Sequence, residues 1–290
     1  MNPQKKLEKS ILKNDLKGVK KALSRGADPN RCDSEYVLPL YRACKLSDMK
    51  IAIALLEEGC NIDALDDFSA TVFWRMCHEG NLKACEFLLS AGADPNIRDE
   101  DNQGPFEMAC WKGHADIIRL FLEKVPGILQ EKAKWPYKWP YLHTACCSGN
   151  PEAVRLLLSA GEDINTVDEV GFSLLHVTAS GWSKECFTPD MVRFLFQNGI
   201  DPGLQAKTTR GKDGTTAVDF LFDAEAVCSK EQRLQIFDVF REYVPGMLLE
   251  KAISLPDNSE LKKETIDWFQ ENQPELYFST WCQTPAGQGI

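Results

Sequence analysis

Apolar residues along this chain recur in short blocks at helical spacing, and glycine-containing turns separate the blocks. One block carries four apolar residues on a single helical face: Leu82, Cys85, Leu88 and Leu89. A shorter block before it ends near Gly80, and the run Gly92–Asn96, of sequence Gly-Ala-Asp-Pro-Asn, follows it as a helix stop. Residues 66–97 therefore predict a turn and two antiparallel helices. Neither helix is long enough to bury its apolar face alone, so the unit must stack between similar units.

The stop recurs along the chain. It begins at five positions: Gly26, Gly59, Gly92, Gly161 and Gly199. The first two intervals are 33 residues each (59 − 26 and 92 − 59), and the third is 69 residues (161 − 92), which leaves room for two units. The sequence at 125–129, Val-Pro-Gly-Ile-Leu, stands where the missing stop should be, and a similar run follows at 244–248. We expect both runs to continue into a further helical turn rather than end sharply.

This period and these residues resemble the ankyrin repeat, a two-helix unit of about 33 residues that opens on a Thr-Pro-Leu-His-x-Ala box. Degenerate copies of the box lie at 38–43, 71–76, 140–145, 173–178 and 216–221, with a shortened copy at 105–109. The box histidine, which in the family hydrogen-bonds across neighbouring turns, survives only as His143 and His176. Four other residues replace it: Tyr41, Trp74, Glu107 and Asp219. We therefore expect hydrogen bonding between repeats to be less regular than in an idealised array.

The resemblance implies an all-α fold, an ankyrin-repeat solenoid of about six full repeats plus an amino-terminal half-repeat and a helical carboxy-terminal cap. The half-repeat covers 5–31, and the full repeats cover about 33–64, 66–97, 99–131, 134–166, 168–204 and 211–250. The sixth of these seven units carries an insert at 182–190. The array then spans 1–252, and 253–290 holds a closing helix, 260–272, and a tail whose end, 283–290, should be disordered.

Charge and hydropathy narrow the class of partner. The net charge is −10, from 43 acidic and 33 basic residues, which argues against a nucleic acid or an anionic membrane surface. No stretch approaches the ~18 to 20 apolar residues of a membrane-spanning helix, and the start leads into an amphipathic helix rather than a signal peptide. We expect that the protein does not insert into a membrane and that it is cytoplasmic. The half-repeat has a lysine-rich outer face, which fits either a solvated cap or a binding strip.

The eleven cysteines indicate packing rather than disulfides or zinc. Four occupy the same slot, the second small residue after the box: Cys44, Cys77, Cys110 and Cys146. A thiol in this slot is a small buried hydrophobe, which fits a reducing compartment. No Cys-x-x-Cys motif occurs, and no cysteine pair is matched with two histidines at zinc-finger spacing. We predict no metal and no cofactor.

Catalytic motifs are also missing from the sequence. A Cys147–His143 nucleophile pair can be drawn at helical spacing, but the box position already accounts for His143, and no oxyanion or third-partner motif accompanies the pair. No phosphate-binding glycine loop follows a strand. The sequence therefore predicts that the protein is not an enzyme.

The positions that vary in ankyrin arrays to choose partners are the turn tips and the residues just after the box. Here we predict a concave partner-binding face from eight of them: Phe68, His78, Glu79, Trp111, Lys112, Tyr137, Trp139 and Phe172. The stiff Trp-Pro-Tyr-rich segment 134–141 lies within this face. Trp111 and Trp139 should be exposed in the unbound protein and dominate binding. The competing interpretation is that these rings pack against one another and only stiffen the turns.

The resemblance implies a class of function, because ankyrin-repeat proteins are overwhelmingly non-enzymatic scaffolds that bind proteins. We expect a monomer with a protein partner. The irregular repeats resemble those of effectors that intracellular bacteria deliver into the host cytosol. The alternative is a ubiquitin-ligase substrate adaptor, although the tail lacks the Leu-x-x-x-Cys box of such adaptors. An enzyme is the third class, and the closing ~40 residues are too short for a transferase or protease domain.

Overall fold

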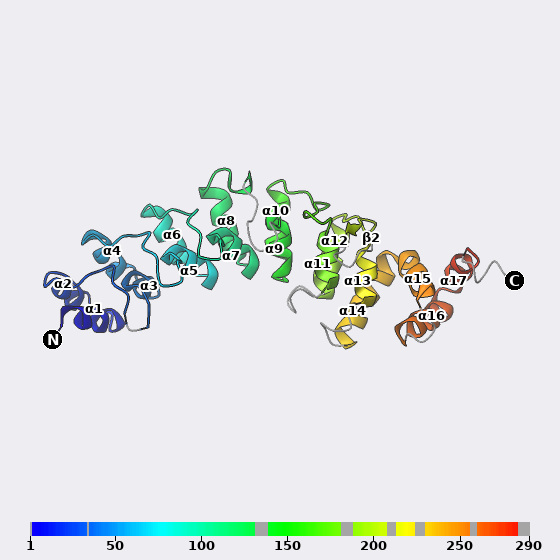
Figure 1. Ribbon diagram of the computed structural model, residues 1–290, viewed down its shortest axis with the longest axis horizontal. Coiled ribbons are helices and arrows are strands. Elements are labelled where there is room, and N and C mark those ends of the chain that lie inside the picture. The colour runs from blue at the N-terminus through cyan, green and yellow to red at the C-terminus, as the bar shows by residue number, and fades with distance from the viewer. Residues whose placement is uncertain are drawn as a thin grey trace. The chain divides into compact units, whose positions relative to one another are not determined.

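The computed structural model describes residues 2–33, 35–130, 139–180, 188–207, 213–223, 230–255 and 260–283. The chain divides into two compact units, residues 1–141 and 142–290. Each unit is built from helices packed side by side (Figure 1). Within the described residues, the extended structure is confined to one two-stranded sheet and an isolated bridge between Leu65 and Thr71. The predicted all-α solenoid of ankyrin type is confirmed in its helical architecture.

The first unit consists of four helix pairs. They are α1 (Pro3–Leu12) with α2 (Leu16–Leu23), α3 (Pro39–Cys44) with α4 (Lys50–Glu57), α5 (Val72–Glu79) with α6 (Leu82–Ser90), and α7 (Pro105–Lys112) with α8 (Ala115–Lys124). The first helices pack in the order α1, α3, α5 and α7, while α2 packs on α4 and α6 on α8. A short 3-10 turn, η1 (Ile128–Gln130), follows α8.

The second unit continues the same scheme with longer helices toward its end. Its elements are α9 (Tyr141–Cys147), which starts at the unit boundary, α10 (Pro151–Ser159), α11 (Leu174–Ser180), α12 (Pro189–Gln197), β1 (Ala206–Lys207), β2 (Asp213–Thr215), α13 (Ala217–Asp223), α14 (Lys230–Tyr243), α15 (Pro245–Ser254), α16 (Glu260–Asn272) and α17 (Pro274–Trp281). Strands β1 and β2 pair antiparallel, with Ala206 opposite Thr215. Helices α15, α16 and α17 pack on one another.

The closing helix predicted at 260–272 is present as α16, but a further helix, α17, forms where we expected only a tail. Pro274 occupies the first turn of α17, where its missing N–H costs nothing and its fixed φ favours a new helix. Most of the predicted insert, residues 182–187, and most of the tail end, residues 284–290, lie outside the described residues.

Local capping explains the two-helix unit at 66–97. The Thr71 hydroxyl accepts a hydrogen bond from the backbone N–H of Trp74 at 3.1 Å and starts α5. Gly80 ends α5 in a left-handed conformation, with φ of 79°. The Asn81 side chain then accepts a bond from the N–H of Ala84 at 3.1 Å and starts α6. A start, a stop and a second start within eleven residues set the two helices antiparallel.

The predicted stops all use a left-handed glycine. The φ values are 83° at Gly26, 85° at Gly59, 93° at Gly92, 102° at Gly161 and 84° at Gly199. A Cβ added at any of the five would meet nothing within 4 Å. Glycine is therefore needed there for its backbone freedom and not for space. The two divergent stops continue as expected, into η1 after 125 and into α15 after 244.

Neighbouring repeats are joined by side-chain bonds at these stops. The N–H of Asn61 donates to Asn30 Oδ1 at 2.7 Å, and the N–H of Asp94 donates to Asp63 Oδ1 at 3.0 Å. In the second unit, the N–H of Asp201 donates to Asn165 Oδ1 at 2.7 Å. In these three pairs, the last residue of one stop accepts a bond from the next stop. We did not predict these hydrogen bonds between successive stops from the sequence.

The box position also joins neighbours, and one of its replacements keeps the original bond. The ring N–H of His143 donates to the carbonyl of Phe172, 29 residues further on, at 2.7 Å. The indole N–H of Trp74 donates to the carbonyl of Gln103, also 29 residues further on, at 3.0 Å. At Trp74 the bond between repeats is therefore kept, because an indole N–H is a donor of similar reach.

At two other box positions the residue caps its own helix, although Asp219 also pairs with Lys251 of α15 at 2.5 Å. Glu107 accepts from the N–H of Gly104 at 2.5 Å, and Asp219 accepts from the N–H of Thr216 at 2.7 Å. Both residues cap their own helix, so the carboxylates cannot donate to a neighbouring carbonyl. The expected irregularity of the box bonds is confirmed at these positions.

The buried core follows the predicted stripes. Four of the second helices, α4, α6, α8 and α10, each contribute two fully buried residues to these stripes: Ile51, Leu55, Cys85, Leu88, Ile118, Phe121, Val154 and Leu157. The four box cysteines, Cys44, Cys77, Cys110 and Cys146, are also fully buried, as the sequence predicts. Burial raises the pKa of the Cys44 thiol to about 12 and raises the pKa of the Cys77 thiol well above its usual value. Within the part of the chain that the structure describes, no group of three or more potential ligands could hold a metal ion.

The stop glycines give a first prediction. Gly92→Ala should lower the free energy of unfolding by about 1–2 kcal/mol, because alanine is strained at a positive φ. Gly246→Ala is the control, since Gly246 lies in α15 at an ordinary φ and with open space around it. That change should stabilise the protein by about 0.5–1 kcal/mol. Urea unfolding measures both changes in the free energy of unfolding. If both variants were stabilised or both destabilised, the assignment of the stops would be contradicted.

The thiols give a second prediction. At neutral pH, Cys44 should hold about a thousandfold less thiolate than a thiol of pKa 9, because each pKa unit is a factor of ten. Cys44 and Cys77 should react far more slowly with a disulfide reagent than the exposed Cys282. Mass mapping of labelled peptides against time measures this, and equal labelling rates in the folded protein would contradict it.

The same pKa shift sets a pH dependence. The unfolded Cys44 ionises near pH 9, whereas the folded residue keeps its proton to about pH 12. Its contribution to stability is therefore complete below pH 9 and is lost as the pH rises from 9 to 12. Cys44→Ala should weaken this alkaline loss of stability.

Candidate partner-binding surface

The surface begins at the turn that precedes α5. Asp66 Oδ1 accepts bonds from the N–H groups of Phe68 and Ala70 at 2.9 and 3.0 Å. Its other oxygen, Oδ2, accepts from Arg75 Nε at 2.8 Å and lies 2.7 Å from Arg75 Nη2. One carboxylate thus fixes the turn and ties it to α5. The turn presents Phe68 at its tip, where the side chain is 57% exposed.

A row of stacked groups runs from this tip along α5. The guanidinium carbon of Arg75 lies 5.3 Å from the ring centroid of Phe68 and 5.5 Å from that of Trp74. The Trp74 ring then stacks on His78, with centroids 5.4 Å apart and planes 8° from parallel. An arginine between two aromatic rings gains cation–π attraction on both sides and loses side-chain freedom before any partner arrives.

Helix α7 packs behind this row. Trp74 is buried together with Ala70 and Met108, and the half-buried Trp111 packs against this cluster. The bond from Trp74 to Gln103 holds the indole in place. We call Phe68, Trp74, Arg75, His78 and Trp111 the ring surface. Trp74 serves as its buried support, and the other four present area to solvent.

Charged groups flank the ring surface. Glu79 accepts a bond from the Tyr41 hydroxyl of the preceding repeat and pairs with Lys45 Nζ at 2.9 Å. Lys112 is exposed at the end of α7. Burial, together with the nearby Lys112 and Arg75, holds the pKa of His78 below its usual value. His78 is therefore neutral near pH 7, and its carbonyl bonds to His114 Nε2 at 3.0 Å.

Five of the eight predicted site residues come together at this surface: Phe68, His78, Glu79, Trp111 and Lys112. Phe172 belongs to the other unit, where it is half-buried, stacked on His176 at 5.4 Å and edge-on to Phe220 at 5.2 Å. Tyr137 and the rest of 131–138 lie outside the described residues. The partner role of all eight stays a prediction.

The expected exposure of Trp139 is wrong. Its side chain is 3% exposed, and Pro140 and Tyr141 beside it are also buried. The Tyr141 ring packs edge-on against Phe106, with centroids 4.7 Å apart. The run before α9 therefore points into the core of its repeat, as the packing interpretation holds. Trp111 is half-buried rather than fully exposed.

Sequence reasoning missed Trp74 and Arg75 as parts of the surface. A signal for Arg75 was present, because an acid and an arginine recur nine residues apart across the turn. Asp33 pairs with Arg42 at 2.5 Å as Asp66 pairs with Arg75, and Arg98 pairs with Glu107 in the reverse order at 2.6 Å. This spacing follows neither the helix nor the strand period, so a search by periodicity passes over it.

The geometry defines a class of protein: a stack of helix pairs with fixed turns that carries an aromatic and cationic surface. A family model described as "Ankyrin repeats (3 copies)" matches residues 7–99, 73–168 and 106–206, which together span 7–206 of the 290 residues. The chain therefore belongs to the ankyrin-repeat family. Ankyrin repeats generally mediate protein–protein interaction, and proteins of this family are typically non-catalytic.

Similar proteins agree with this assignment. Human and mouse protein phosphatase 1 regulatory subunit 27 are each 42% identical to this chain over 60 residues, which is 21% of this chain and 36% of theirs. The ankyrin repeat domain of Bcl-3, a member of the IkappaB family, aligns with a TM-score of 0.60 and 20% identity, over 81% of this chain and 97% of that one. The human ASB11 ankyrin repeat domain aligns with a TM-score of 0.58 and 24% identity, over 79% and 95%.

The chain thus covers about a third of the length of the curated relatives that it matches. The two solved structures share its fold, and their sequence identities are too low to support a statement about function. Among the described helices, none is long and apolar enough to cross a membrane.

The turn carboxylate gives a third prediction. Asp66→Ala should lower the free energy of unfolding by about 1–3 kcal/mol, because two backbone N–H groups and Arg75 lose their acceptor. It should also speed hydrogen exchange at the amides of Phe68 and Ala70. Asp67→Ala removes the same charge from the neighbouring exposed position and should change stability by less than about 0.5 kcal/mol. Equal effects of the two variants would show that Asp66 does not organise the turn.

Proposed function

We propose that this chain is a non-enzymatic scaffold that binds a protein partner through its ring surface. The observation that carries the proposal is the Arg75 guanidinium between the rings of Phe68 and Trp74, next to a tip phenylalanine that is 57% exposed. Exposed aromatic rings cost solubility, and Trp, Tyr and Arg dominate interface energies. The buried Trp74 keeps the surface rigid, so a partner orders few side chains on binding.

The surface also indicates the kind of partner segment. Lys112 supplies exposed positive charge beside the rings, while Arg75 is paired with Asp66 and Glu79 is engaged by Tyr41 and Lys45. An apolar side chain flanked by an acidic one would fit this arrangement, the first against Phe68 and Trp111 and the second toward Lys112. The overall negative charge of the chain makes the exposed positive charge of Lys112 selective for an acidic side chain placed beside the rings.

Burial supports the non-enzymatic part of the proposal. His143 is fully buried and Cys147 is 2% exposed, so the pair cannot reach a substrate from these positions. Buried thiols with raised pKa values also favour a reducing compartment, and we therefore propose a cytosolic location. We also propose that the chain acts as a monomer. The two finer readings, a host-directed bacterial effector and a ubiquitin-ligase adaptor, receive no support from the similar proteins.

The fourth prediction tests the ring surface. Phe68→Ala should leave the melting temperature nearly unchanged and weaken partner binding roughly 30-fold, since ~2 kcal/mol is a typical cost at an interface centre. Phe278→Ala is the matched control, because that ring is 61% exposed but lies on α17. Proteins retained from cytosolic extract by the wild-type chain would be identified and their affinities for each variant measured.

Two outcomes would contradict the proposal. One is equal loss of binding by the Phe68 and Phe278 variants. The other is a large fall in melting temperature for Phe68→Ala, which would show that this ring only stiffens the turn. Trp111→Ala should give a smaller binding loss together with some loss of stability, because that ring is already half-buried.

A further inference from the structure

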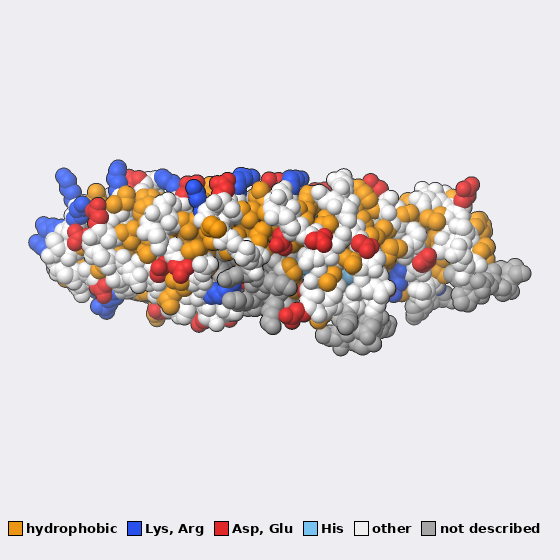
Figure 2. Space-filling model, turned by 90° about the horizontal axis from the view of Figure 1, so that it is seen from above, with side chains coloured by type: hydrophobic (Ala, Val, Ile, Leu, Met, Phe, Trp, Pro, Cys, Tyr) orange, Lys and Arg blue, Asp and Glu red, His pale blue; other side chains and the backbone are white. Residues whose placement is uncertain are grey.

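Charge is distributed unevenly along the chain. The first 25 residues contain eight basic and two acidic residues, a net charge of +6 (8 − 2). The other 265 residues contain 25 basic (33 − 8) and 41 acidic (43 − 2), a net charge of −16. Figure 2 shows lysine and arginine side chains gathered at the amino-terminal end of the face that it displays. An end repeat must be polar, but polarity alone does not require one sign of charge.

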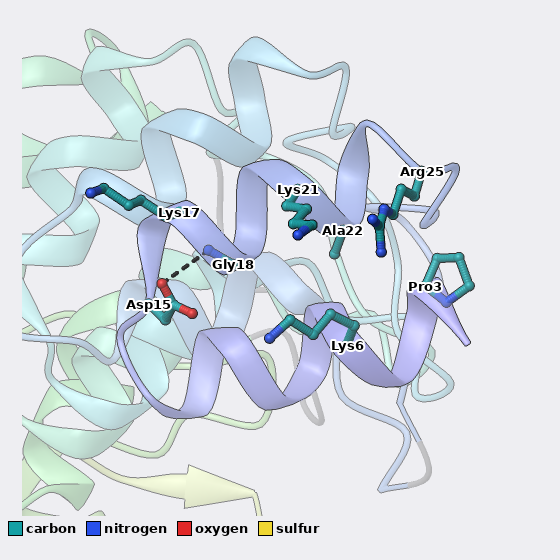
Figure 3. A pocket seen from close by; sticks show the side chains of 8 residues that line it. All are labelled: Pro3, Lys6, Asp15, Lys17, Gly18, Lys21, Ala22 and Arg25. Atoms are coloured by element: carbon teal, nitrogen blue, oxygen red, sulfur yellow. Dashed lines mark hydrogen bonds between the residues drawn. The ribbon is translucent and has the colours of Figure 1, made fainter. Parts of the chain in front are cut away.

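Part of this charge lines a concave pocket. A cavity of about 400 Å³ lies between α1 and α2. Figure 3 shows Lys6 on α1 and Lys21 on α2, the two helices that border the pocket, with Arg25 after the end of α2. Pro3 and Ala22 add apolar wall between the charged groups. The pocket is large enough for one side chain and its neighbours, and too small for an extended surface.

Four basic side chains line the pocket, because Lys17 joins the three named above, and none of the four forms an ion pair within the described residues. Among the ion pairs recorded within the described residues, the one that involves this segment joins Lys20 to Glu57 at 3.8 Å. Asp15 also lines the pocket, but its Oδ1 accepts the bond from the Gly18 N–H at 2.9 Å that caps α2. Lys6, Lys17, Lys21 and Arg25 thus concentrate positive charge at the pocket, with one carboxylate, Asp15, in its lining.

We propose that the pocket between α1 and α2 binds a phosphate monoester carried by a protein partner. Such a group has a charge of about −1.5 to −2 and three acceptor oxygens, which matches a pocket lined by several cations better than a single carboxylate does. Arg25 can hold two phosphate oxygens with its planar fork, while Lys6 and Lys21 act as point charges from both helices. Pro3 and Ala22 would contact the residue next to the phosphorylated one.

The charge of the rest of the chain favours a peptide over a membrane or a nucleic acid. An extended anionic surface would bring many negative charges close to the acidic remainder, which carries −16. A single phosphate interacts mainly within the Debye length of about 8 Å at physiological salt, and so mainly with the basic segment. The pocket is separate from the ring surface, and a partner could use either one alone.

The test uses the full chain and a fluorescein-labelled peptide of glycine and alanine around one phosphoserine. Fluorescence anisotropy at low ionic strength would give its dissociation constant, with the unphosphorylated peptide and inorganic phosphate as competitors. The variant Lys6→Gln/Arg25→Gln should weaken binding about tenfold or more. Lys9→Gln/Lys13→Gln changes the net charge equally on exposed residues of α1 and its C-cap that do not line the pocket, and it should change binding by less than about twofold.

The proposal is supported if the phosphorylated peptide binds more tightly than its unphosphorylated counterpart, phosphate competes, and only the pocket variant loses binding. Equal losses for the two double variants would overturn it in favour of a diffuse basic strip. Binding to phosphatidylserine vesicles without binding to the phosphopeptide would overturn it in favour of a membrane. Phe68→Ala should leave phosphopeptide binding unchanged, so failure of the ring surface and failure of this pocket are distinguished.

Discussion

Every helix pair in this chain depends on its neighbours, because a helix of eight or nine residues cannot bury its apolar face alone. Leu88 of α6, for example, is fully buried only because the chain places further helix pairs beside it. The bonds between successive stops, such as that from Asp94 N–H to Asp63 Oδ1, fix the spacing at which this burial occurs. The stability of such an array is the sum of the folding free energies of the single repeats and the interaction free energies between neighbouring repeats. The interactions between neighbours decide whether a repeat folds.

The same dependence links the scaffold to the candidate surface. Trp74 stands at the box position, and its indole N–H bonds to the next repeat through Gln103. Its ring also supports Arg75 and His78 on the surface. One residue therefore holds two repeats together and arranges the groups that a partner would meet. A box histidine supplies the first role with a smaller ring, which explains why a degenerate box need not weaken the array.

The fold could be predicted from the sequence because its two determinants are local. A 33-residue period and a glycine that must adopt positive φ can both be read without knowing any contact. The surface could be predicted only in part. Trp139 is buried although its local sequence resembles an exposed turn, and the Asp66–Arg75 pair crosses a turn that has no period of its own. Helix α17 was missed because its apolar residues follow too closely on α16 to look like a separate element.

The two candidate binding sites of the first unit depend on the array to different degrees. The ring surface uses the turn before α5, the face of α5 and the support of α7, so it exists only while two neighbouring repeats remain packed. The pocket is lined by α1, α2 and the residues next to them, and this pair packs on α3 and α4. Loss of the contacts between α5 and α7 would therefore remove the ring surface and leave in place the contacts on which the pocket depends. A polar end repeat can carry a site of its own because only one of its sides must be matched to a neighbour.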